Sequence, residues 1–103
     1  MKVDVKLLHI FESRDLGRPH YFSFQISEKG NEQNAATFMI NANDHAEDLF
    51  DTILRVSRNE PVDELKFLRL VLTCKQAGMY SKIHRKFLKC LADQFYLNNG
   101  AAR

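Results

Sequence analysis

The sequence predicts a single small α+β domain, in which a three-stranded antiparallel β-meander over residues 1–41 precedes three α-helices, giving the order βββααα. Two observations carry this prediction. Apolar and polar residues alternate over the first forty positions, which is typical of strands with one buried face. From residue 44 onward, apolar residues recur every three or four positions, as in amphipathic helices. A length of 103 residues fits one domain, and 45% hydrophobic residues can form a core.

Each predicted strand has an alternating pattern that assigns one face to the core. Gly17 and Pro19 interrupt the pattern after the first strand, and the polar segment EKGNEQN interrupts it after the second. Connections this short favour antiparallel neighbours. The residues expected on the core face are Val3, Val5, Leu7, His9 and Phe11 in the first strand, Phe22, Phe24 and Ile26 in the second, and Ala36, Phe38 and Ile40 in the third.

The helices are predicted over residues 44–58, 63–77 and 81–97, with a frayed tail over 98–103. Asp44 and Glu47, three residues apart, form a capping-box-like start for the first helix. Pro61 limits its end, because the residue before a proline disfavours helical backbone angles. Gly78 is expected to cap the second helix, and Ser81 is expected to be the N-cap of the third.

The second helix is unusually rich in apolar residues. At 100° per residue they cover an arc of about 220°, which is wider than a surface helix needs. We therefore expect this helix to be the central, most buried one. Its polar strip is narrow and consists of Lys66, Arg69, Thr73 and Gln76.

The third helix is predicted to carry a strip of positive charge. On a helical wheel its apolar residues, including Ile83 and Phe87, fall on one arc, and the basic residues fall on the opposite arc. Cations three and four positions apart repel one another, and an anionic partner would relieve that repulsion. A solvated face without a partner is the alternative, since Lys and Arg are good helix formers. The candidate binding residues are Lys82, Arg85, Lys86 and Lys89, with Lys66 and Arg69 of the second helix.

Charge is also divided unevenly along the chain. Residues 1–64 hold twelve Asp and Glu against seven Lys and Arg, a net charge of −5. Residues 65–103 hold eight Lys and Arg against the single Asp93, a net charge of +7. This asymmetry suggests electrostatic partnering and carries no information about the fold.

No motif of catalysis or cofactor binding is present. The chain has no Gly-rich phosphate loop, no nucleophile elbow and no metal-ligand spacing. His84 falls on the apolar arc of the third helix, where a hydrogen-bonded core histidine is expected. The acids around His45 fit a helix start better than proton transfer. We expect no enzymatic activity, no cofactor and no metal.

The N-terminal segment is charged from its second residue and does not resemble a signal peptide. No apolar run approaches the roughly 18 residues of a membrane-spanning helix. Cys74 and Cys90 fall on apolar helix faces, which favours free thiols over a disulfide between the two helices. These features predict a soluble, cytoplasmic protein without a membrane partner.

The leading hypothesis is a small non-enzymatic binding or regulatory protein, inhibitor- or adaptor-like, that docks on an acidic surface of a larger protein through the third helix. Small proteins of mobile genetic elements share this profile, by analogy only. Self-pairing of an edge strand would give a homo-oligomer. The alternative is binding of DNA or RNA, because residues 63–97 have the helix, Gly-containing turn and helix order of a helix-turn-helix unit.

Overall fold

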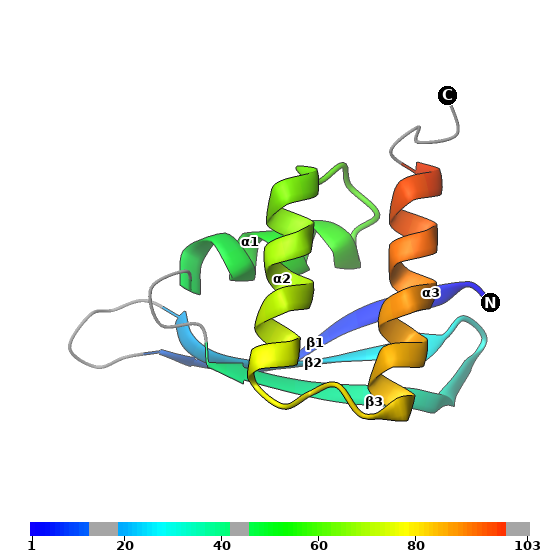
Figure 1. The fold of residues 1–103 in the computed structure, drawn as a ribbon, viewed down its shortest axis with the longest axis horizontal. Coiled ribbons are helices and arrows are strands. Elements are labelled where there is room, and N and C mark those ends of the chain that lie inside the picture. The colour runs from blue at the N-terminus through cyan, green and yellow to red at the C-terminus, as the bar shows by residue number, and fades with distance from the viewer. Residues whose placement is uncertain (13–18, 42–45, 99–103) are drawn as a thin grey trace.

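The computed structural model describes residues 1–12, 19–41 and 46–98, and its elements follow the order βββααα. The strands are β1 (Val3–Glu12), β2 (Pro19–Glu28) and β3 (Asn31–Asn41), and the helices are α1 (Ala46–Ser57), α2 (Glu64–Gln76) and α3 (Lys82–Asn98). The strands form one antiparallel sheet in the order β1-β2-β3, and the helices lie on one face of it (Figure 1). The predicted fold class is therefore confirmed.

The core lies between this face of the sheet and the helices. In β2 and β3, the predicted alternation is correct: Phe22, Phe24, Ile26, Phe38 and Ile40 are fully buried. Phe24 and Phe38 are cross-strand partners whose rings stack with centroids 4.9 Å apart. Such aromatic pairs stabilise adjacent strands and fix their register.

Strand β1 departs from the predicted alternation. Val3 is buried and Val5 and Leu7 pack against the core, but the register shifts between Leu7 and His9. His9 is consequently opposite Ser23, on the face away from the helices, and is exposed. The prediction that His9 shares the face of Val3 was wrong, because a β-bulge inserts one residue and reverses the alternation beyond it.

The connection between β2 and β3 is shorter than the polar segment suggested. Only Lys29 and Gly30 form the turn, and Gly30 has φ 86°, a conformation that favours glycine. Asn31 is already the first residue of β3. The polar residues after it extend an edge strand, where exposed polar side chains are common.

Local signals explain the boundaries of α2. The Asp63 side chain caps its start by accepting from the backbone amides of Leu65 and Lys66. Gly78, with φ 80°, follows the C-cap Ala77 as predicted, and the Met79 amide donates to the Cys74 carbonyl over 2.9 Å.

Some predicted features lie outside the described residues: Gly17, Asp44, His45 and residues 99–103. Helix α1 is described from Ala46, so the structure does not test the predicted pairing of Asp44 with Glu47.

Candidate docking surface

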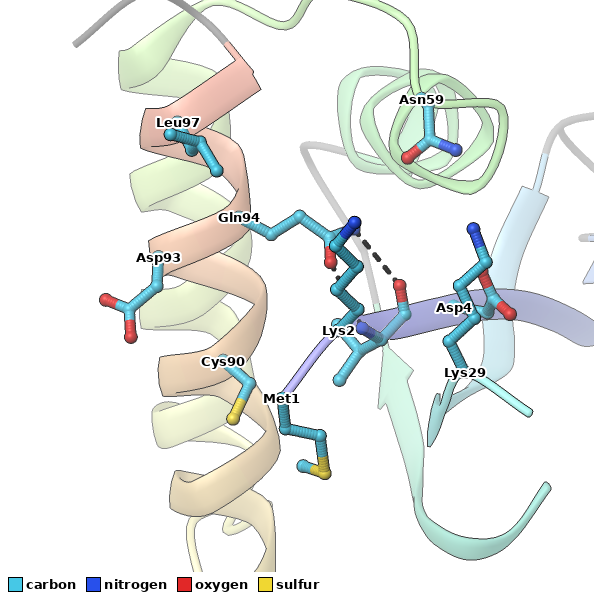
Figure 2. A pocket seen from close by; sticks show the side chains of 10 residues that line it. Met1, Lys2, Asp4, Lys29, Asn59, Cys90, Asp93, Gln94 and Leu97 are labelled. Atoms are coloured by element: carbon cyan, nitrogen blue, oxygen red, sulfur yellow. Dashed lines mark hydrogen bonds between the residues drawn. The ribbon is translucent and has the colours of Figure 1, made fainter. Parts of the chain in front are cut away.

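Helix α3 is fixed on the sheet by its apolar side and by hydrogen bonds to both edge strands. Near its start, His84 Nε2 lies 2.9 Å from the Thr37 carbonyl oxygen of β3. A carbonyl oxygen only accepts, so Nε2 carries the proton. Near its end, Gln94 Oε1 accepts from the Val3 amide and Gln94 Nε2 donates to the Val3 carbonyl, both over 3.1 Å (Figure 2). These contacts set the rotation of α3 about its axis.

Two residues with predicted roles lie near the start of α3, His84 as a core histidine and Ser81 as the N-cap. His84 is half-buried, its ring lies 4.7 Å from that of Phe38, and its Nδ1 lies 2.7 Å from Ser81 Oγ. The hydrogen bonds of His84 agree with the predicted core histidine, but the ring is only partly buried. Ser81 precedes the helix and its carbonyl accepts from the Arg85 amide, as at an N-cap. Its hydroxyl, however, bonds to the His84 ring instead of capping the backbone.

The basic residues of α3 face solvent. We call Lys82, Arg85, Lys86 and Lys89 the basic strip; all of them are exposed. The salt bridges of the described residues involve Arg55 or Arg69, and none includes a member of the strip. Between residues 65 and 98 the only acidic residue is Asp93. The positive charge of this surface is therefore little compensated within the described part of the chain.

Helix α2 is a surface helix, so the prediction of a central, most buried helix was wrong. Its buried residues are Phe67, Leu70 and Cys74. A second apolar stripe points away from the core and consists of Leu65, Leu68 and Leu72, which are 75%, 46% and 53% exposed. We call these three residues the leucine stripe. The wide apolar arc thus comprises one side that packs on α1 and the sheet and another that has no described partner.

The helices α2 and α3 form an antiparallel αα-hairpin. The Tyr96 hydroxyl, near the end of α3, donates to Glu64 at the start of α2 over 3.0 Å. Next to this pair, the Phe67 and Phe95 rings stack with centroids 4.3 Å apart. The helices lie side by side and connect at the opposite end (Figure 1). Contacts between the ends that lie far from the connection do not match a helix-turn-helix unit, whose helices diverge at about 90–120°.

The turn of this hairpin holds an exposed aromatic ring between two cations. The Lys75 Nζ lies 4.8 Å, and the Arg85 guanidinium carbon 5.8 Å, from the centre of the Tyr80 ring. Both distances suit cation–π attraction. Tyr80 is 37% exposed, so this cluster extends the positive surface from α3 toward α2.

The six predicted binding residues occupy two separate positions on the helices. Arg69 bonds to Asp48 of α1 over 3.3 Å, and Lys66 is on the same side of α2 by helical periodicity. The basic strip lies on the neighbouring helix, beyond the leucine stripe. The structure therefore places exposed leucines between two groups of basic residues, and we call this combined surface the docking face.

Sequence reasoning missed the leucine stripe, although a signal was present. Leu65, Leu68 and Leu72 have the i, i+3, i+7 spacing of a second apolar seam. An apolar arc of about 220° is typical of a central helix with a narrow exposed strip, but two apolar seams on one helix produce the same arc.

Two titratable groups near the helical hairpin have shifted pKa values. Burial raises the pKa of the Cys74 thiol from 9.0 to about 12, because the thiolate would lose its hydration. The hydrogen bond from Tyr96 to Glu64 raises the pKa of the phenol, since a phenolate would lie beside a carboxylate. Cys74 and Cys90 are both free thiols, as predicted.

A pocket of about 620 Å³ lies on the other side of α3, next to the start of β1 (Figure 2). Its lining includes both signs of charge, and the amide of Gln94 within it is already bonded to Val3. In Figure 2, Asp93 points away from the other lining side chains. The lining offers no convergent set of polar groups for one ligand. The residues around the pocket are Met1, Lys2, Val3, Asp4, Lys29, Asn59, Cys90, Asp93, Gln94 and Leu97.

Residues 1–12, 19–41 and 46–98 contain no group of three or more His, Cys, Asp or Glu that could hold a metal ion. Within the same ranges, no helix has the length and apolar character needed to cross a membrane. No protein-family model matches the chain, and neither a curated protein nor a solved structure shows significant similarity to it.

Proposed function

We propose that this protein is a non-enzymatic binding protein, regulatory or adaptor-like, that docks on an acidic surface of a partner protein through the docking face. The observation that carries the proposal is the leucine stripe, three exposed apolar side chains flanked by basic residues on the same helical hairpin. Apolar side chains at the centre and charged side chains at the rim are the usual anatomy of a protein interface.

The basic residues supply the electrostatic part of the proposed interaction. Lys82, Arg85, Lys86 and Lys89 have no salt bridge among the described residues, so they can pair with carboxylates of a partner without breaking internal pairs. Charges at the rim of an interface mainly accelerate association and select the partner. They add less to affinity than a desolvated apolar centre does.

Nucleic-acid binding remains the alternative, because exposed cations on one helix are also what a phosphate backbone attracts. Two features favour the protein partner. The antiparallel hairpin is not the arrangement that presents a recognition helix to the major groove. Exposed leucines have no counterpart in phosphate contacts, which require basic and polar side chains.

A matched pair of charge-reversal variants tests the proposal. The first changes Lys82, Arg85, Lys86 and Lys89 to Glu. The control changes Lys2, Lys6, Lys29 and Arg58 to Glu, which are exposed residues outside the docking face and alter the net charge equally. A partner captured from source cells is purified, and its affinity for each variant is measured by calorimetry at several salt concentrations.

We expect the first variant to bind the purified partner at least about tenfold more weakly, with the control close to wild type. Equal affinities of both variants would contradict the proposal. Labelled duplex DNA and RNA are titrated in parallel. Tight binding that falls steeply with salt, and is lost only in the first variant, would replace the proposal by the nucleic-acid alternative.

A further inference from the structure

We infer that the partner element that covers the leucine stripe is an acidic amphipathic α-helix, lying along α2. This inference rests on the proposed function and specifies the chemistry of the occupant. Three observations support the inference: the heptad spacing of the leucines, the basic residues beside them, and the internal ion pairs of Asp48 and Asp51 on α1.

The stripe has the geometry of a helix-packing seam. Leu65, Leu68 and Leu72 correspond to successive a, d and a positions of a heptad, and they extend about 10 Å along the axis of α2. A narrow seam of this kind is covered efficiently by one helix laid along it, whose own apolar residues at heptad spacing insert between the leucines. A loop or a flat sheet has no such periodic match.

The charges on each side of the stripe indicate which charged residues the partner helix should carry beside its own apolar seam. Lys66 flanks it toward α1, beside Arg69, whose charge is already paired with Asp48, and Lys75 flanks it toward α3, where the basic strip begins. In a coiled coil, residues beside the apolar seam face the e and g positions of the partner helix, and their charges select that partner. Carboxylates on both sides of the occupant's apolar seam would therefore be complementary.

In a second copy of the chain, Asp48 and Asp51 of α1 are poor candidates for these carboxylates. Asp51 already pairs with Arg55 over 3.1 Å, and Asp48 already pairs with Arg69 over 3.3 Å. Packing α2 on another α2 would bring the basic flanks of both copies to one interface. Like charges at close range disfavour such a contact.

An anionic membrane surface is also a poorer match. Helices that lie in a membrane interface bury a broad apolar face, commonly with Trp or Phe. Here the exposed seam is a single row of three leucines along one helix, and its neighbours include the acidic Glu64. The chain has no Trp.

The test uses a synthetic peptide of about three heptads with Leu at a and d and Glu at e and g. The Glu residues prevent the peptide from pairing with itself. Two matched peptides serve as controls: one has the same composition shuffled so that no leucine seam forms, and the other has Lys in place of Glu. Binding is measured by fluorescence anisotropy.

The protein variant changes Leu68 and Leu72 to Gln, a good helix former, and the matched control changes Leu97 to Gln. Leu97 is 68% exposed but lies outside the stripe. We expect binding of the acidic peptide alone, weakened about tenfold or more in the double variant and unchanged in the control. Equal binding of the shuffled peptide, or wild-type affinity in the double variant, would overturn the inference.

The outcomes separate this inference from the proposed function. Loss of the captured partner in both the basic-strip variant and the leucine variant, without binding of the acidic peptide to the wild-type protein, would leave the proposed function standing and overturn the helix inference. Sedimentation with phosphatidylserine vesicles and analytical ultracentrifugation complete the test. Leucine-dependent binding to vesicles, or a leucine-dependent dimer, in place of peptide binding would equally overturn it.

Discussion

At the level of single residues, two polar side chains of α3 satisfy backbone groups that the edges of the sheet leave open. Gln94 bonds to both the amide and the carbonyl of Val3, and His84 bonds to the carbonyl of Thr37. Unpaired groups on edge strands invite pairing with other chains. These bonds therefore join α3 to the sheet and also reduce the edge available for self-pairing at those positions.

The Gln94 contact leads to a stability prediction. Gln94→Leu keeps a similar volume but removes both hydrogen bonds to Val3. We expect the free energy of unfolding to fall by about 1–3 kcal/mol, since two part-buried backbone groups lose partners. Urea denaturation measures this fall, and hydrogen exchange should be faster at the Val3 amide. Gln76→Leu, on the exposed side of α2, is the control, and an equal effect of both substitutions would contradict the assigned role.

Cys74 leads to a prediction about alkaline stability. Its pKa is raised from 9.0 to about 12 in the folded protein, so between these values the folded state holds a proton that the unfolded state has lost. Stability is therefore unaffected by this thiol below pH 9 and falls as the pH rises through this range, by up to about 1.4 kcal/mol per pH unit.

Substitution by Ala removes that pH dependence while lowering overall stability. Urea denaturation at several alkaline pH values should show a smaller decrease for Cys74→Ala than for wild type, and Cys90→Ser should behave as wild type. If the free energy of unfolding falls equally with pH in the Cys74 variant and in wild type, ionisation of this thiol does not contribute to the alkaline loss of stability.

At the level of elements, the boundaries and alternation were predictable wherever one local signal dominated. Asp63 and Gly78 delimit α2, and the Phe-rich alternation of β2 assigns its core face, because caps and period-two patterns act over a few residues. The bulge after Leu7 was not predictable, since it depends on pairing with β2 and leaves no composition signal in β1.

The burial of α2 was mispredicted for a different reason. Periodicity shows which residues share a side of a helix, but it does not show how many sides other elements cover. Phe67 and Leu68 belong to one continuous apolar arc, yet Phe67 is buried and Leu68 is 46% exposed. The exposure of the basic strip was predictable because its four residues lie opposite the buried residues of α3 on the wheel.

The two sides of α2 should respond differently to substitution. Leu70→Ala, on the buried side, is expected to lower the free energy of unfolding by about 2–5 kcal/mol, because it opens a cavity under α2. Leu68→Gln, on the leucine stripe, is expected to change it by no more than about 0.5 kcal/mol. Chemical denaturation of both variants checks this, and a large loss for Leu68→Gln would mean that the stripe is structural.

At the level of the whole molecule, the division of charge along the chain becomes a division in space. The acids of residues 1–64 include Asp48 and Asp51, which pair internally, whereas the basic residues of α3 do not pair within the described residues. The surplus positive charge thus lies on the outer side of the helical hairpin, beside the leucine stripe. The opposite side of the molecule is the open face of the sheet, where Asp4, Lys6 and Thr37 are exposed, Met39 is 43% exposed and Ser23 is buried.

This arrangement predicts how salt acts on docking. Screening of exposed charges should slow association of a protein partner as ionic strength rises, while dissociation, controlled by the leucines, changes little. Stopped-flow or surface-plasmon measurements on the purified partner give both rates. Leucine variants should instead accelerate dissociation. A salt effect confined to dissociation would contradict this division of roles.

The most direct test of the docking face is a two-dimensional NMR map of the isotopically labelled protein with its captured partner. We predict that amide and leucine methyl signals change in residues 65–75 and 82–89, with the signals of Asp4, Lys6 and Met39 on the open face of the sheet unaffected. Changes centred on that open face, with Leu68 and Lys89 unperturbed, would show that the helical hairpin is not the surface that binds.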